Sequence, residues 1–136
     1  MSKYVEKAIE LHEKGYNCAQ AVLCAFDDKT GIEHDVLYRL AEGFGSGMGN
    51  KKNTCGALSG AVILAGLKSS SGDCNNPTKK DTYKLVSKIA DIFEAKCLTF
   101  NCRDIKGIDT GNPTISCGEC IKTAVEAVSD VLFAEQ

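Results

Sequence analysis

The sequence predicts an all-α protein, with a single compact bundle of six to seven helices over residues 1–136. Apolar residues recur at spacings of three and four in several stretches, as they do on the buried face of a helix. Residues that commonly cap helices precede most of these stretches. No segment alternates apolar and polar residues for long enough to indicate a strand. A chain of 136 residues is long enough for one domain with a substantial core.

Three helices are predicted in the first third of the chain. The first covers Ser2–Lys14, and Gly15 is placed to end it. The second begins after Asn17, because asparagine is a good N-cap residue and the side chain of Gln20 can return a hydrogen bond to it. The third runs from about Glu33 to Glu42.

A glycine-rich loop follows, with glycine at every second position from Gly43 to Gly49. Such a loop can adopt positive φ repeatedly and can place bare backbone N–H groups against a ligand. Gly47 and Gly49 are therefore predicted to line a functional site. They do not fit the spacing of a phosphate-binding loop, and no strand is predicted before them.

The most apolar stretch of the chain is expected to form the central helix, from about Thr54 to Lys68. Thr54 is predicted as its N-cap, which would place Cys55 in the first helical turn. Gly56 and Gly60 lie four residues apart on one face of this helix. Because the side chains on that face are small, another helix or a bulky inorganic group can approach it. Both glycines are therefore candidate cofactor-binding residues.

Three further helices are predicted in the last half of the chain. The first is long, begins at Asn76-Pro77 and carries Cys97 on its inner face. The second is short and begins after Asn101. A turn is expected at Gly111-Asn112-Pro113, and Ser116 with Glu119 forms the sequence of a capping box before the last helix.

Bulk composition excludes several classes of partner. The net charge of −2 provides no basic field for nucleic acid or for anionic lipid. The longest apolar run without a charge, 57–67, is too short to cross a bilayer. The N-terminal residues carry charges where a secretion signal needs an apolar core. We therefore expect a cytoplasmic protein with neither nucleic acid nor a membrane as partner.

The chain has eight cysteines, which in a reducing compartment indicate metal binding or redox chemistry rather than disulfides. Four of them directly follow a capping residue and would each open a helix, where free N–H groups favour a thiolate. These four are far apart in sequence, so only the fold could assemble them into one site. The predicted metal ligands are Cys18, Cys55, Cys102 and Cys117.

The other four cysteines have different contexts. Cys120 forms a C-x-x-C motif with Cys117, and this pair is the candidate catalytic dithiol. Cys24 and Cys97 are expected to pack in the core, and Cys74 is expected to be exposed in a polar loop.

The motifs around these cysteines resemble the C_GCAxxG_C_C family of redox-active proteins. The resemblance rests on Asn17–Val22, on Thr54–Gly60 after the glycine-rich loop, on Cys102–Gly107 and on Cys117 with Cys120, and it extends from about Lys7 to Leu132. It implies the same four signature cysteines that the capping argument selects. It also implies a redox role, because related domains are associated with split-Soret cytochromes, in which an iron–sulfur site has been suspected.

Three functions follow as hypotheses. The first is an iron–sulfur cluster for electron transfer or redox sensing, because four cysteines suit such a cluster. The second is metal-free thiol–disulfide chemistry, as an oxidoreductase or redox sensor, through Cys117 with Cys120 or Cys18 with Cys55. The third is a structural zinc site. A redox partner protein is expected, and the small face of the central helix is compatible with a homodimer.

Overall fold

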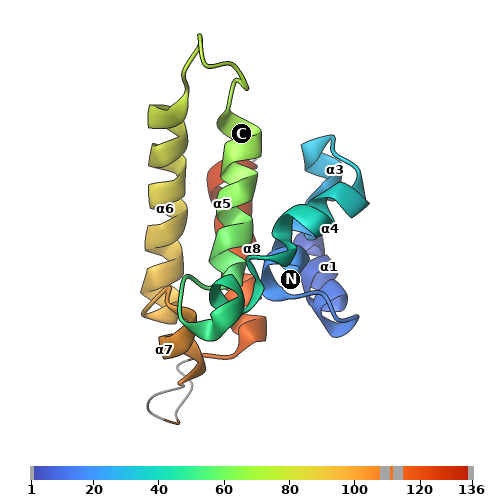
Figure 1. Ribbon diagram of the computed structural model, residues 1–136, viewed down its shortest axis with the longest axis vertical. Helices are drawn as coiled ribbons and strands as arrows, with labels where there is room; N and C mark the ends of the chain where they lie inside the picture. The colour runs from blue at the N-terminus through green and yellow to red at the C-terminus, as the bar shows by residue number, and fades with distance from the viewer. Residues whose placement is uncertain (1, 108–110, 112–114, 135–136) are drawn as a thin grey trace.

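The protein is all helical, as predicted. The computed structural model describes residues 2–107, 111 and 115–134, except for the side chain of Lys106. Within this part of the chain there are eight α-helices, one tight turn labelled η1, and no strand (Figure 1). Six of the helices have seven or more residues, close to the predicted number, and the two short ones are single turns. The elements are α1 (Lys3–Glu13), α2 (Cys18–Ala25), α3 (Asp27–Thr30), α4 (His34–Glu42), η1 (Gly47–Lys51), α5 (Gly56–Ser69), α6 (Lys79–Cys97), α7 (Cys102–Lys106) and α8 (Cys117–Leu132).

Several predicted caps are present. The Asn17 side chain accepts a hydrogen bond from the Gln20 backbone N–H at 2.9 Å, and the Gln20 side chain accepts one from the Asn17 N–H. Asn101 caps α7 and Ser116 caps α8 through side-chain oxygens that accept backbone N–H groups. These caps satisfy N–H groups that a helix start leaves without an internal partner. The predicted turn at Gly111-Asn112-Pro113 lies mostly outside the described residues.

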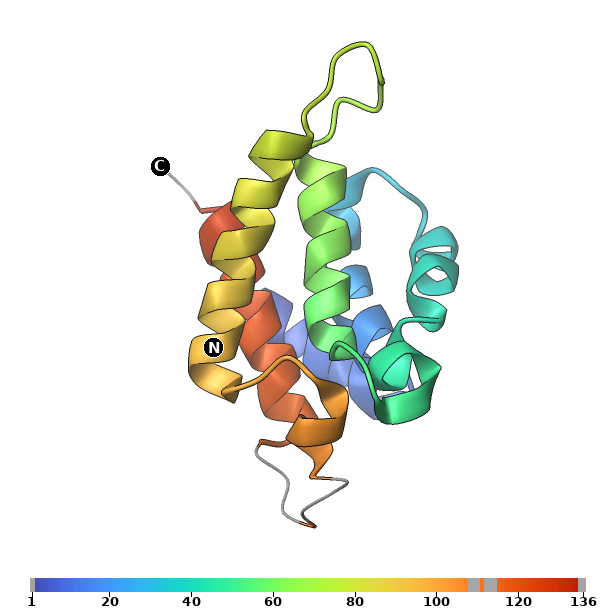
Figure 2. The same cartoon turned by 60° about the vertical axis from the view of Figure 1, so that its left-hand side comes forward.

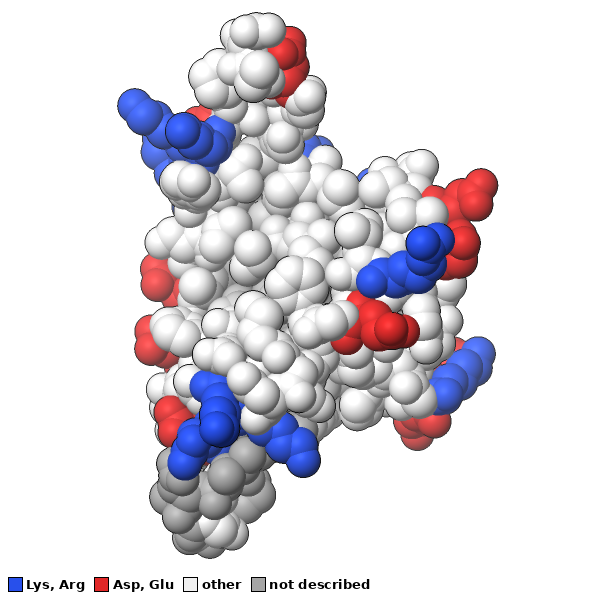
Figure 3. All heavy atoms as spheres, viewed as in Figure 1, with Lys and Arg blue, Asp and Glu red and all other residues white. Residues whose placement is uncertain are grey.

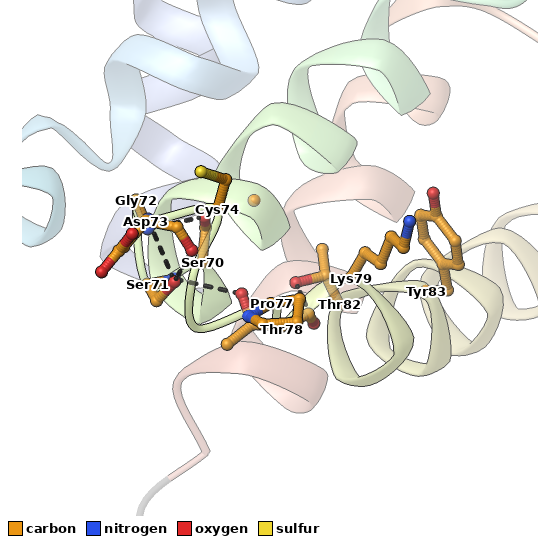
Figure 4. A pocket seen from close by; sticks show the side chains of 11 residues that line it. Ser70, Ser71, Gly72, Asp73, Cys74, Pro77, Thr78, Lys79, Thr82 and Tyr83 are labelled. Carbon is orange, nitrogen blue, oxygen red and sulfur yellow. Dashed lines mark hydrogen bonds between the residues drawn. The ribbon is translucent and has the colours of Figure 1, made fainter.

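Two predicted helix starts were wrong by a few residues. Helix α5 begins at Gly56 with Cys55 as its N-cap, because Thr54 forms an isolated antiparallel bridge with Asn101 instead. Helix α6 begins at Lys79 rather than after Asn76. The loop before it is held by its own hydrogen bonds, in which the Ser71 hydroxyl donates to the Asn76 carbonyl at 2.6 Å (Figure 4).

Helix α5 lies at the centre of the bundle and contacts α2, α6 and α8. It is apolar around most of its circumference, as a helix surrounded by others should be. Gly60 sits where α2 crosses, and a Cβ atom there would lie 2.8 Å from the Ala19 carbonyl oxygen. Glycine therefore permits the close approach of these two helices.

Helices α5 and α8 run in the same direction, so their N-termini lie at the same end of the bundle (Figure 2). Helix α7 and η1 lie at this end too, while the α5–α6 loop lies at the opposite end (Figure 1). In the described part of the chain, no helix combines the length and the apolar character that a membrane span requires.

Candidate functional site

A small cavity at this end of the bundle brings five of the cysteines together. Its volume is about 120 Å³. All four predicted metal ligands line it, and each comes from a different helix start: α2, α5, α7 and α8. The fifth is Cys120, one turn into α8. The lining residues are His12, Asn17, Cys18, Ser46, Cys55, Gly56, Cys102, Ile105, Cys117 and Cys120.

Backbone hydrogen bonds between two distant segments place Cys55 beside Cys102. The Cys55 N–H donates to the Phe100 carbonyl at 2.6 Å, and the Cys102 N–H donates to the Asn53 carbonyl at 2.7 Å. The Asn101 side-chain amide also donates to the Lys52 carbonyl at 2.9 Å. These bonds fix two cysteines that are far apart in the sequence at one edge of the cavity.

Gly47 allows η1 to pack directly against Cys102. Its φ is +57°, a conformation that favours glycine. A Cβ atom at this position would overlap the Cys102 side chain and would lie 2.9 Å from the Asn53 carbonyl oxygen. Gly47 therefore supports the wall of the cavity from behind Cys102.

The four glycines predicted to bind a cofactor have different positions. Gly56 lines the cavity, and Gly47 contacts Cys102. Gly49 does not line the cavity, because the positive φ of Met48 and Gly49 turns the chain toward solvent. Gly60 does not line it either, since it lies one turn further along α5 in the contact with α2.

Cys55 and Cys120 both line the cavity and are joined by a side-chain hydrogen bond, and the two residues are 5% and 1% exposed. The hydrogen bond from Cys120 and the backbone N–H groups of Ala57 and Leu58 lower the pKa of Cys55 to about 7, although burial opposes this. The same hydrogen bond, together with burial, raises the pKa of Cys120. At neutral pH Cys55 is therefore about half in the thiolate form, while Cys120 stays a thiol.

Cys97 lies behind this pair and does not line the cavity. Its sulfur is 4.0 Å from the sulfur of Cys120, and its side chain is fully buried. Burial raises the pKa of Cys97. The sequence correctly predicted its burial, but not its contact with Cys120. That contact depends on the packing of α6 against α8, which the local sequence does not encode.

His12 also lines the cavity. It is half-buried, and its Nδ1 lies 3.0 Å from the Tyr16 carbonyl oxygen. Because a carbonyl only accepts, Nδ1 carries the proton in this contact, which leaves Nε2 as the acceptor nitrogen of the neutral ring. His34 does not line the cavity, and it is hydrogen-bonded to the side chains of Tyr16 and Asp27.

The remaining two cysteines lie away from the cavity, as predicted. Cys24 is fully buried in α2, and burial raises its pKa to about 11. Cys74 is exposed in the α5–α6 loop, where it borders a cavity of about 500 Å³ (Figure 4). This larger cavity lies at the end of the bundle opposite the five grouped cysteines (Figures 1 and 4).

The cysteines that line the cavity do not form a ready-made site for a single metal ion. Across residues 2–107, 111 and 115–134, no group of three or more His, Cys, Asp or Glu side chains is placed to hold one metal ion. Four thiolates bound to a single zinc ion would lie roughly 4 Å from one another. The described cysteines are not grouped in this way.

An apolar cavity of about 440 Å³ adjoins the cysteine site between η1, α5 and α6. Phe44, Met48 and Phe100 line it, and Met48 is 43% exposed. On the face shown in Figure 3, charged side chains lie mainly at the edges and the middle is uncharged. The exposed Lys51 and Lys52 belong to the segment between this cavity and the cysteines.

Comparisons with known proteins agree with this arrangement. No curated protein and no solved structure matches the chain. One family model matches residues 16–131, and its description is "Putative redox-active protein (C_GCAxxG_C_C)". The matched residues include all five cysteines of the cavity. With most of its length matched, the chain belongs to the C_GCAxxG_C_C family of redox-active proteins.

Proposed function

We propose that the cavity is a redox centre in which Cys18, Cys55, Cys102 and Cys117 hold an iron–sulfur cluster for electron transfer or redox sensing. One observation carries this proposal: four cysteines from four separate helix starts line the same cavity of about 120 Å³. A protein that needed only a dithiol would require two neighbouring cysteines and no such space.

The lack of a single-ion site among the described residues favours a cluster over one bound ion. No three potential ligands in the described residues are placed around one metal position. In a [4Fe–4S] cluster each cysteine binds a different iron, so the ligand sulfurs stand further apart than they do around one zinc ion. The structural zinc hypothesis is therefore less well supported than the cluster.

The chain's own residues would prepare such a site. The lowered pKa of Cys55 makes the thiolate form that metal binding requires easier to reach at neutral pH than in an ordinary thiol. Backbone N–H groups at the helix starts can donate to sulfur and stabilise its negative charge. A bound cluster would supply one-electron transfer at a potential set by these hydrogen bonds and by burial. Cluster assembly requires reduced thiols, so we place the protein in the cytoplasm, with a redox partner protein.

A second role is favoured by the contact between Cys55 and Cys120. A thiolate next to a protonated thiol is the arrangement in which a thiol–disulfide exchange reaction begins. In the metal-free protein these two residues would cycle between dithiol and disulfide. The predicted catalytic dithiol, Cys117 with Cys120, shares one member with this pair, but the hydrogen bond favours Cys55 as the first partner of Cys120.

The test is to identify the group that the protein binds. Protein purified without oxygen would be incubated with iron and sulfide, and bound iron and acid-labile sulfide would be measured. Iron K-edge X-ray absorption would then report the neighbours of the metal. We expect sulfur ligands and scattering from a second iron atom. Iron with sulfur neighbours but no neighbouring iron would contradict a cluster, as would protein that retains no sulfide.

A further inference from the structure

A buried cysteine next to the site has no role in the proposed cluster. Cys97 ends α6, and its sulfur lies 4.0 Å from that of Cys120 in α8. Cys120 is in turn hydrogen-bonded to Cys55, which lines the cavity. Three reduced cysteines are therefore connected pairwise, from Cys55 through Cys120 to the buried Cys97.

We propose that Cys55, Cys120 and Cys97 form a thiol relay that moves an oxidation from the cavity into a buried Cys97–Cys120 disulfide. The relay rests on the thiol role proposed above for the metal-free protein. Its oxidant is a hydroperoxide, of which hydrogen peroxide is the smallest. A cavity of about 120 Å³ has room for such a molecule, because a water molecule takes up about 30 Å³ of liquid volume.

The relay consists of three balanced steps. Cys55 attacks one peroxide oxygen, the O–O bond breaks, and a sulfenic acid and one water form. The Cys120 thiol gives its proton to the departing hydroxyl group while its sulfur attacks the sulfenic sulfur, which yields the Cys55–Cys120 disulfide and a second water. Cys97 then attacks the sulfur of Cys120, the first disulfide breaks, and the proton of Cys97 passes to Cys55. Overall, two thiols lose two electrons and two protons, and one peroxide becomes two waters.

The geometry requires only a small movement for the last step. A disulfide bond is about 2.05 Å long, so the two sulfurs must approach by roughly 2 Å. Both side chains are at least 99% buried, with 0% exposure for Cys97 and 1% for Cys120. The product disulfide would therefore be shielded from further oxidation. Cys55 would return to its reduced form, ready to serve as a ligand again.

Disulfide mapping of the metal-free full-length chain tests the relay. Reduced protein would receive one equivalent of hydrogen peroxide, remaining thiols would be blocked at low pH, and the protein would be digested without reduction. Trypsin leaves Cys97 and Cys102 on one peptide and Cys117 and Cys120 on another, since no lysine or arginine lies between the two cysteines of either peptide. Tandem mass spectrometry must therefore assign each bond by fragmentation within these peptides.

In the wild-type protein we expect a Cys97–Cys120 disulfide and an alkylated Cys55. In C97A the oxidation should stop at the Cys55–Cys120 disulfide, so Cys55 should no longer be alkylated. C24A is the matched control, because Cys24 is equally buried in another helix, and it should behave as wild type.

Two outcomes overturn the relay in different ways. If wild type and C97A both give the Cys55–Cys120 disulfide, Cys97 takes no part, but the thiol role of the first pair stands. If neither Cys55 nor Cys120 forms a disulfide while exposed Cys74 is oxidised, both the relay and the thiol role fail. Iron and sulfide analysis would still decide the cluster separately.

Discussion

The reactivity of Cys55 depends on a hydrogen bond from one neighbour and on the helix start at which it lies. Its pKa is lowered to about 7, first by the thiol of Cys120 and then by the N–H groups of Ala57 and Leu58. A free cysteine ionises at a pKa of about 8.5. The difference means that Cys55 is about half ionised at neutral pH, when an ordinary thiol is almost wholly protonated.

Alkylation of metal-free protein tests this assignment. The thiolate is the reactive form, so the rate at Cys55 should rise about tenfold per pH unit below pH 7 and level off above it. C120A lacks the hydrogen bond that contributes most to lowering the pKa of Cys55. The pH midpoint of the alkylation rate should therefore move upward toward that of a free thiol. Iodoacetamide rates followed by mass spectrometry from pH 5 to 10 measure both midpoints. A wild-type midpoint at or above 8.5 contradicts the assignment.

Gly47 and Gly49 form a matched pair for testing the wall of the site. Both have positive φ, so alanine at either position costs about 1–2 kcal/mol in backbone strain. Only at Gly47 would the added Cβ also meet Cys102 and the Asn53 carbonyl, whereas nothing lies within 4 Å at Gly49. G47A should therefore lose roughly 1–3 kcal/mol more stability than G49A in urea denaturation. Equal losses would mean that η1 does not pack against Cys102 as described.

At the scale of elements, the crossing of α2 over α5 positions Cys18 relative to Cys55. This crossing depends on Gly60, where a Cβ would lie 2.8 Å from the Ala19 carbonyl oxygen and 3.2 Å from the Val22 side chain. Both neighbours belong to a helix, so neither can move without shifting α2.

Alanine substitutions at two glycines of α5 should have opposite effects. G60A should destabilise the protein by roughly 1–3 kcal/mol through overpacking. G66A should stabilise it by up to about 1 kcal/mol, because nothing lies within 4 Å of its added Cβ and alanine favours the helix. Urea unfolding measures both changes. A G60A variant as stable as G66A would contradict the close crossing of α2 and α5.

The end of α6 holds a leucine in the left-handed conformation. Leu98 has φ +69° and is 72% exposed, while its N–H donates to the Glu94 carbonyl at 2.7 Å. This turn directs the chain toward Phe100 and Asn101, which hydrogen-bond to the segment before α5. A residue with a Cβ pays about 1–2 kcal/mol for this conformation.

Glycine at Leu98 should relieve that strain. We expect L98G to raise the free energy of unfolding by on the order of 0.5 kcal/mol, after the greater entropy of the unfolded glycine is subtracted. The control is L40G, at a leucine inside α4 that is 48% exposed, which should lose at least about 1 kcal/mol. Thermal or urea unfolding compares the two. Equal destabilisation would show that Leu98 is not strained.

At the scale of the whole molecule, the local sequence predicted the longer helices and selected four cysteines that the fold brings to one cavity. The capping box at Asn17 and the side-chain caps at Asn101 and Ser116 are local features, so they could be recognised without the fold. They also marked the cysteines that follow them. The assembly of these cysteines depends on long-range contacts that no local pattern encodes.

Two details illustrate this limit. Thr54 has the chemistry of an N-cap, but its pairing with Asn101 overrides that preference and moves Cys55 into the cap position. Cys97 has the pattern of an ordinary core residue, and only the packing of α6 on α8 brings it to Cys120. In both cases a tertiary contact overrides the role that the local sequence predicts for the residue.

The assignment of the four ligands is tested most directly by single serine substitutions. Iron and acid-labile sulfide would be measured after anaerobic reconstitution of C18S, C55S, C102S and C117S, with C74S as the control outside the cavity. The proposed centre predicts that each of the four variants loses most of its bound iron and sulfide, while C74S keeps the wild-type content. If all four variants retain iron and sulfide as C74S does, these cysteines do not form one metal centre.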